Sequence, residues 1–168
     1  MLHYRDTREL QNQISNRIVL FIAGLVFSGV TAFPIEGELR IAHQWITRNE
    51  WDNVFTKWIA CVYQGVHETN SAYPFISYGS DWLGFAHIII AIAFLGPLKD
   101  PVKNRWIIEF GLIACLAIFP FALIAGAVRG IPIFWRFIDC MFGIVGGWIL
   151  WSCYIRIKLL ESIKSLNA

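Results

Sequence analysis

The stretch FWRFIDCMFG, residues 134–143, decides the fold because it lies inside an apolar run that extends from Ile131 to Ile155. That run is long enough for a membrane-spanning helix, which needs about 17–25 mostly apolar residues. Arg136 and Asp139 stand three positions apart within it, and ionisable side chains are costly in the hydrocarbon region of a membrane. The sequence therefore predicts a span whose polar face is turned away from lipid.

The composition of the whole chain agrees with a membrane protein. Of its 168 residues, 57% are hydrophobic and only 15% are charged, whereas soluble domains carry about 25% charged residues. The net charge of +2 is too small to indicate a nucleic-acid partner, and no RNA- or DNA-reading motif is present. The four cysteines show no paired spacing, so neither a disulfide framework nor a zinc site is predicted.

Three further apolar runs, residues 17–33, 81–98 and 106–128, join residues 131–155 as predicted spans. Between the first two, residues 51–67 repeat apolar side chains at helical spacing, which is typical of an amphipathic helix lying in the membrane interface. A fifth span there is the alternative, but its apolar core is short and contains Lys57. The predicted fold class is all-α: a single polytopic membrane domain over residues 1–168, with four transmembrane helices in a bundle and one interfacial helix.

The basic residues predict an orientation for these spans. Most of the 14 lysines and arginines fall on one side if the N-terminus, the loop near Lys99 and the C-terminus share that side. Positively charged loops face the cytoplasm. Both termini are therefore predicted to be cytoplasmic.

Polar residues within the spans share helix faces with small residues. Asp139 shares its face with Gly143 and Gly146, and His87 shares its face with Gly84. Small residues let helices approach closely in membranes. At 1.5 Å per residue, His87 and Asp139 lie on the order of 9 Å and 12 Å below the same, outer side.

These depths predict a polar pocket that opens outward. We expect His87 and Asp139 to carry acid–base chemistry there, because a carboxylate can orient an imidazole. The residues expected to bind a ligand's headgroup are Arg136, Arg129, Glu36, Glu68 and Asp81. The alternatives are purely structural: Arg136 neutralises Asp139, His87 forms an interhelical hydrogen bond, and Asp81 and Glu68 lie at solvated helix ends.

The sequence identifies no cofactor. It lacks the tight histidine and glutamate spacings of a metal site, and His3, His43 and His67 fall outside the spans, where a bis-histidine haem could not use them. The function predicted first is binding, with chemical conversion as an option, of a lipid or other amphiphilic small molecule. The alternatives are a non-catalytic membrane subunit or assembly factor and a proton- or ion-coupled carrier. The small-residue faces also leave room for a homodimer or a membrane complex partner.

Overall fold

The computed structural model describes residues 2–166, and side chains over residues 7–165. It is 89% helical, and no strand occurs in the described range. Four helical stretches are long and apolar enough to cross a membrane: Thr7–Ala32, Pro74–Lys99, Arg105–Val128 and Ile133–Ser165. The all-α class and the four apolar spans are thereby confirmed, as expected for an integral multi-pass membrane protein.

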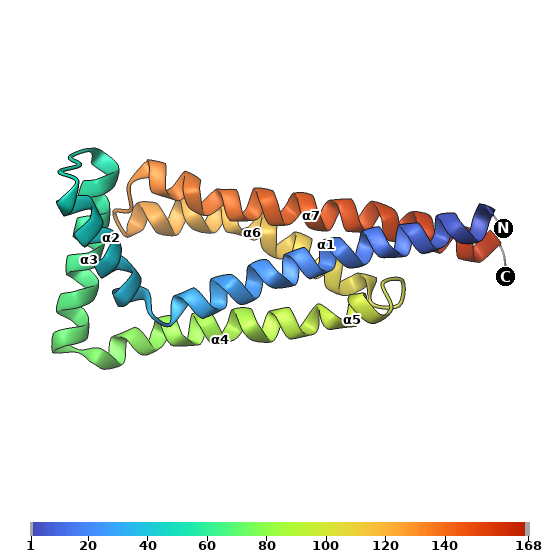
Figure 1. Ribbon diagram of the computed structural model, residues 1–168, viewed down its shortest axis with the longest axis horizontal. Coiled ribbons are helices and arrows are strands. Elements are labelled where there is room, and N and C mark those ends of the chain that lie inside the picture. The colour runs from blue at the N-terminus through green and yellow to red at the C-terminus, as the bar shows by residue number, and fades with distance from the viewer. Residues whose placement is uncertain (1, 167–168) are drawn as a thin grey trace. The chain divides into compact units, whose positions relative to one another are not determined.

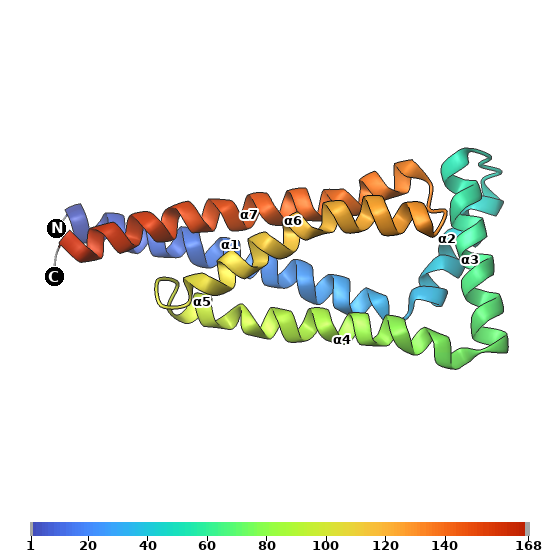
Figure 2. The same cartoon turned by 180° about the vertical axis from the view of Figure 1, so that it is seen from behind.

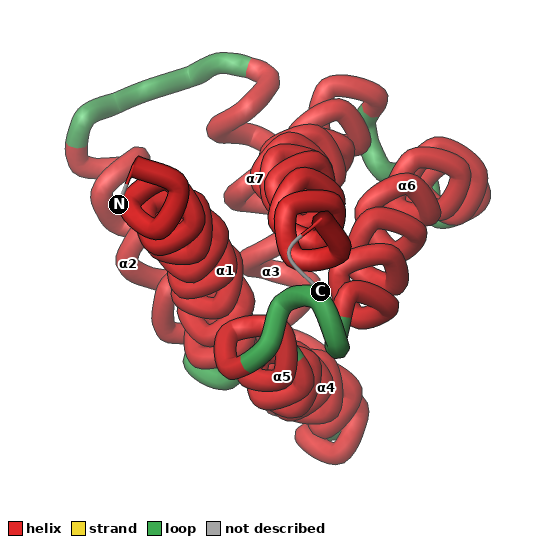
Figure 3. Tube along the Cα trace, turned by 90° about the vertical axis from the view of Figure 1, so that its right-hand side faces the viewer, coloured by secondary structure: helices red, strands yellow, loops and turns green. Residues whose placement is uncertain are grey.

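The helices follow one another with short connections, drawn in green in Figure 3. In chain order they are α1 (Leu2–Ala32), α2 (Ile35–Arg48), α3 (Val54–Ala72), the 3₁₀ turn η1 (Pro74–Ser77), α4 (Tyr78–Ala93), α5 (Leu95–Lys99), α6 (Arg105–Val128) and α7 (Ile133–Leu166). The second span, Pro74–Lys99, is therefore interrupted at Phe94, between α4 and α5. Helix α4 ends at Ala93 because Pro97, four residues later, has no N–H to donate to the Ala93 carbonyl.

The chain packs into two compact units. Residues 1–24 and 91–168 form one, called here the α6–α7 unit. Residues 25–90, which hold the end of α1, then α2, α3, η1 and most of α4, form the other, called here the hairpin unit.

Helices α6 and α7 run side by side in the α6–α7 unit (Figures 1 and 3). Residues fully buried in this unit recur at helical spacing on α7: Leu150, Cys153, Ile157 and Leu160. The first part of α1 contributes Ile14 and Ile18 to the same core, and its N-terminal end lies beside the C-terminal end of α7 (Figure 2). Apolar stripes at three- and four-residue spacing thus form the core.

Close approach of α6 and α7 depends on glycine. A Cβ atom added at Gly143 would lie 2.7 Å from the carbonyl oxygen of Cys115, and one at Gly111 would lie 2.6 Å from Leu150 Cδ1. The prediction that Gly143 and Gly146 let another helix approach is therefore confirmed. That helix is α6: Cys115 lies next to Gly143 through its carbonyl oxygen and next to Gly146 through its Sγ, which is 3.1 Å from an added Cβ.

In the hairpin unit, α1 and α4 approach through a reciprocal glycine contact. A Cβ at Gly29 would lie 2.8 Å from the Gly84 carbonyl oxygen, and a Cβ at Gly84 would lie 2.6 Å from that of Gly29. The small face predicted on α4 is correct at Gly84. On α1 the contact residue is Gly29.

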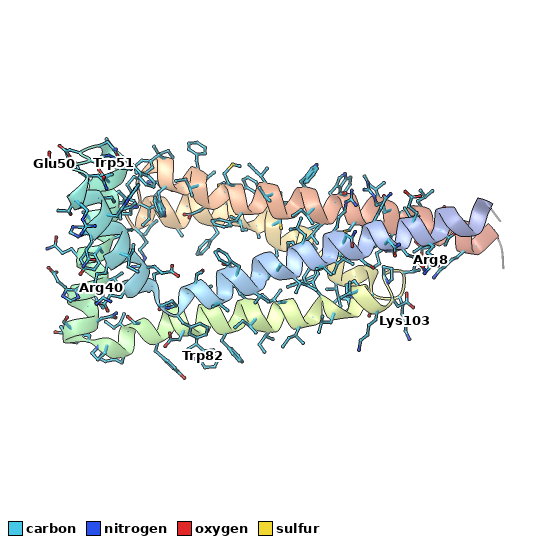
Figure 4. All side chains as sticks on the ribbon, viewed as in Figure 1. Arg8, Arg40, Glu50, Trp51, Trp82 and Lys103 are labelled. Carbon is cyan, nitrogen blue, oxygen red and sulfur yellow. The ribbon has the colours of Figure 1, made fainter. Side chains whose placement is uncertain are left out.

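The segment between the first two spans contains two helices, whereas one was predicted. Helix α3 begins at Val54 because Asn53 and Thr56 form a capping box, and it continues to Ala72, past the predicted end at residue 67. Helix α2 was not predicted. The turn that joins them carries Glu50 and Trp51, both labelled in Figure 4, and Glu50 has a positive φ of 54°.

Candidate functional site

Arg136 and Asp139 do not form the salt bridge that their spacing allows. Arg136 Nε donates to the carbonyl oxygen of Ile131 at 2.7 Å, and its side chain lies over Gly126, where an added Cβ would meet Arg136 Cγ and Cδ at 2.9 Å. Asp139 has no hydrogen-bond or ion-pair partner among the side chains of residues 7–165. The hypothesis that Arg136 neutralises Asp139 is therefore wrong. Gly126 has no side chain, so Arg136 packs over it on α6 and bonds to the loop before α7 instead.

Among the described side chains, the other predicted residues of the spans likewise have no partner of opposite charge. Arg129 is exposed at the C-terminal end of α6. His87 Nδ1 donates to the carbonyl oxygen of Leu83 on its own helix at 2.8 Å, which leaves Nε2 as the acceptor of the neutral ring. His87 belongs to the hairpin unit and Asp139 to the α6–α7 unit, and their pairing stays a prediction. Asp81 is half-buried in the first turn of α4.

Glu36 is the predicted residue that the structure places at the centre of a polar cluster. Its Oε2 accepts a hydrogen bond from Asn70 Nδ2 at 2.6 Å, and its Oε1 lies 2.7 Å from His67 Nδ1. Asn70 Oδ1 in turn accepts from the Ser77 hydroxyl. Helices α2 and α3 form an antiparallel hairpin, so the first turn of α2 meets the last turns of α3. We call Glu36, His67, Asn70 and Ser77 the Glu36 cluster.

Aromatic stacking positions the imidazole of His67. The ring of Tyr63 stacks on His67 with centroids 5.7 Å apart, and on its other neighbour, His43 of α2, at 4.9 Å. Glu68, the neighbour of His67 in sequence, is exposed and accepts a hydrogen bond from Gln64 at 2.8 Å. Glu68 is therefore outside the cluster. Its exposure agrees with the alternative prediction that it lies at a solvated helix end.

The cluster favours a charged carboxylate. The hydrogen bond from Asn70 and then that from His67 hold the pKa of Glu36 below its ordinary value, because both donors stabilise the ionised form. Glu36 is accordingly an anion at neutral pH, and it has no arginine or lysine in salt-bridge contact among the described side chains. The positive charge of Arg40, four residues later on α2, also lowers the pKa of Glu36, by the smallest of these effects.

An apolar cavity of about 480 Å³ adjoins the cluster within the hairpin unit. Its wall is formed by α2, α3, η1 and the start of α4, through the apolar residues Ile35, Val62, Val66 and Ile76 and the small or hydroxyl-bearing residues Gly65, Thr69, Ser77 and Ser80. Ser77 belongs to both the cavity wall and the Glu36 cluster. The site therefore combines an apolar space with one polar corner, which is the usual composition of a small-molecule site.

No group of three or more metal-ligating side chains occurs within the described part of the chain. Comparison with known proteins adds no relationship: no protein-family model matches the chain, and neither a curated protein nor a solved structure is significantly similar to it. The function is therefore inferred from the geometry of the chain itself.

Proposed function

We propose that this multi-pass membrane protein binds an amphiphilic small molecule in the hairpin unit. The apolar part of the ligand occupies the cavity lined by Val62, Val66 and Ile76, and its polar head reaches the Glu36 cluster. The observation that carries the proposal is Ser77, whose hydroxyl joins the cluster while its residue lines the cavity.

The charge of the cluster selects the head of the ligand. Glu36 is an anion whose two fixed partners are donors, and a carboxylate accepts further hydrogen bonds at its remaining lone pairs. A head that donates, such as an amine or a hydroxyl, fits this corner. A carboxylate head does not fit, because two anions at contact distance repel each other.

We place the α2–α3 hairpin at the membrane interface. It lies between two candidate spans and exposes aromatic side chains, among them Trp45 and Trp51, which pack edge to face at 4.6 Å. Tryptophan is enriched at membrane–water boundaries. An amphiphile would reach a cavity at this level directly from the lipid leaflet.

The same geometry gives an acid–base candidate for conversion of the ligand. Glu36 contacts Nδ1 of His67, and a carboxylate in that position orients an imidazole for proton transfer through its other nitrogen. His67 thus joins His87 and Asp139, the candidates predicted from sequence. Arg136 and Arg129 belong to the α6–α7 unit and are not part of this site, so their role as headgroup contacts stays a separate prediction.

A filled cavity tests the binding proposal. A Cβ at Gly65 meets no atom within 4 Å, and neither does one at Gly37 on α2, which is outside the cavity wall. Gly65→Leu should fill the cavity without disturbing the backbone, and Gly37→Leu is its matched control. The probe is a photoactivatable long-chain alkylamine with an alkyne tag, added to phosphatidylcholine liposomes that contain the protein.

We expect the alkylamine to label α3 and η1 of the wild type and of Gly37→Leu, and to label Gly65→Leu about tenfold less. Glu36→Gln should weaken labelling to a similar extent, because hydrogen bonds to charged groups contribute about 1.5–3 kcal/mol. The carboxylate of equal chain length should label poorly throughout. Equal labelling of all folded variants would refute the proposal.

A non-catalytic subunit of a membrane complex is the second candidate. It is favoured by the sparse burial of the four spans, of whose apolar windows only 17–28% is buried, and by Asp139, which lacks a partner in the described chain. Extraction in a mild detergent should then recover a stoichiometric partner chain. Asp139→Asn should release that partner while leaving the helical content unchanged, and retention of the partner would count against Asp139 as its contact.

A further inference from the structure

Two arginines meet on one serine hydroxyl where α1 packs against α7. Arg17 Nε donates to Ser152 Oγ at 2.6 Å, and Arg156 Nη1 donates to the same oxygen at 2.8 Å. The two donor nitrogens are therefore no farther apart than these two bonds laid end to end. Gln13 provides two more acceptors, its carbonyl oxygen for Arg17 Nη1 and its Oε1 for Arg156 Nε, each at 3.0 Å.

All of these acceptors are uncharged. Neither Arg17 nor Arg156 forms an ion pair with any carboxylate of residues 7–165. The Nη2 groups of both arginines also donate to no acceptor in that range. Two guanidinium charges at this distance repel each other, and an anion held between them would remove that repulsion.

A third arginine of the same unit shows what neutralisation looks like in this protein. Arg105, at the start of α6, contacts Glu109 at 3.0 Å and Glu161 of α7 at 2.7 Å. Among the side chains of residues 7–165, two carboxylates contact Arg105 and none contacts the pair formed by Arg17 and Arg156.

The pair lies at the boundary of the apolar stretches. Arg17 directly precedes IVLFIAGLVF, residues 18–27, and Arg156 directly follows ILWSCYI, residues 149–155. Because α1 and α7 are antiparallel here, both arginines mark the same end of their spans. Aromatic and basic side chains surround this level of α7: Trp151 stacks on Tyr154 at 5.7 Å, and Lys158 Nζ lies 6.0 Å from the Tyr154 ring. Such a belt is typical of the headgroup region.

We propose that Arg17 and Arg156 form a binding site for the phosphate group of an anionic phospholipid. Guanidinium groups match phosphate oxygens in geometry and donate charge-assisted hydrogen bonds to them. The level of the site suits a lipid headgroup, and clustered basic residues beside a span attract anionic lipids. This site shares no residue with the Glu36 cluster, so the two proposals stand or fall separately.

Lipid-dependent thermal stability of the purified full chain in detergent tests the proposal. The probes are short-chain phosphatidylglycerol, phosphatidylcholine of equal chain length, and inorganic phosphate. The variant is Arg17→Gln/Arg156→Gln. Its charge-matched control is Lys99→Gln/Lys103→Gln, two exposed lysines of the same unit, of which Lys103 is labelled in Figure 4.

We expect phosphatidylglycerol to raise the melting temperature of the wild type and of the lysine control, and phosphatidylcholine to raise it much less. In the arginine variant the phosphatidylglycerol needed for half the shift should increase about tenfold or more, the loss expected for each charged hydrogen-bonding group removed. Inorganic phosphate should act weakly, since it lacks the acyl chains. A shift as large as that of the lipid would support the phosphate site and assign it to the free ion.

A purely structural role gives a different result. In that case the arginine variant melts at a lower temperature in every condition, while the shift caused by phosphatidylglycerol keeps its size and its concentration dependence. That outcome overturns the proposal, as does an equal loss of the shift in the lysine control.

Discussion

The glycines of helices α6 and α7 differ from those of helices α2 and α3 in the space around them. On α6 and α7, Gly111 and Gly143 lie so close to neighbouring helices that an added Cβ would be 2.6–2.7 Å from the nearest atom. On α2 and α3, Gly37 and Gly65 have no atom within 4 Å of that position. The first pair is required for close packing of spans, whereas the second leaves room, and at Gly65 this room is part of the cavity. Dense packing therefore marks the scaffold, and unfilled space marks the candidate site.

The same substitution in both units gives the largest expected effect. Gly143→Ala should destabilise the protein by about 1–3 kcal/mol, the usual cost of overpacking, because the Cys115 carbonyl oxygen belongs to a helix backbone and cannot move alone. Gly65→Ala should leave stability unchanged or raise it by up to about 1 kcal/mol, since alanine is the better helix former. Thermal or denaturant unfolding in one detergent measures both.

Equal destabilisation by the two variants would remove the contrast between scaffold and site. Gly37→Ala serves as a second open-space variant on α2, so that a special effect of position 65 is recognised. Its outcome should match that of Gly65→Ala.

The second prediction concerns the hairpin unit and the dependence of its stability on pH. The hydrogen bonds from Asn70 and His67 lower the pKa of Glu36 in the folded chain. Its contribution to stability is then fully present above the ordinary glutamate pKa of about 4.3, and it is lost as the pH falls through the lower, folded value. Glu36→Gln should lack this acid-induced loss. Unfolding measured from pH 6 down to pH 3 should show the two curves converging at the acid end.

A wild-type stability that rises on acidification over that range would contradict the assignment. Glu38→Gln, two positions along α2 and exposed, is the control: it removes the same charge without touching Asn70 or His67, and it should keep the acid-induced loss of the wild type.

The sequence determines some of these features locally and others only through tertiary contacts. Apolar runs predict the spans because burial in lipid depends on composition over one helix. The sequence of α2 also carries a helical pattern, since Ile35, Leu39, Ala42 and Ile46 repeat at helical spacing. Helix α2 was not predicted because it is shorter than α3 and less apolar on average.

The contacts of the candidate site could not be predicted from the spacing of residues in the sequence. Glu36 meets His67 only because the α2–α3 turn sets the register of the hairpin. Arg136 and Asp139 show the reverse case, because spacing allows a pair within α7, yet Gly126 on another helix offers Arg136 a better position. Sequence spacing proposes partners, and the neighbouring helix decides between them.

The smallest predicted effect concerns one ion pair in each unit. Arg105 and Glu161 connect α6 to α7, with side chains 30% and 42% exposed, whereas Lys57 and Asp52 are 69% and 74% exposed at the start of α3. Exposed pairs contribute about 0.2–1 kcal/mol, and salt screens them. Glu161→Gln should therefore cost less than about 1 kcal/mol and Asp52→Asn still less, with both losses shrinking as salt is raised. A loss for Glu161→Gln that equals that of Gly143→Ala and resists salt would mean that the α6–α7 unit is held by charge, and that glycine packing alone does not define its scaffold.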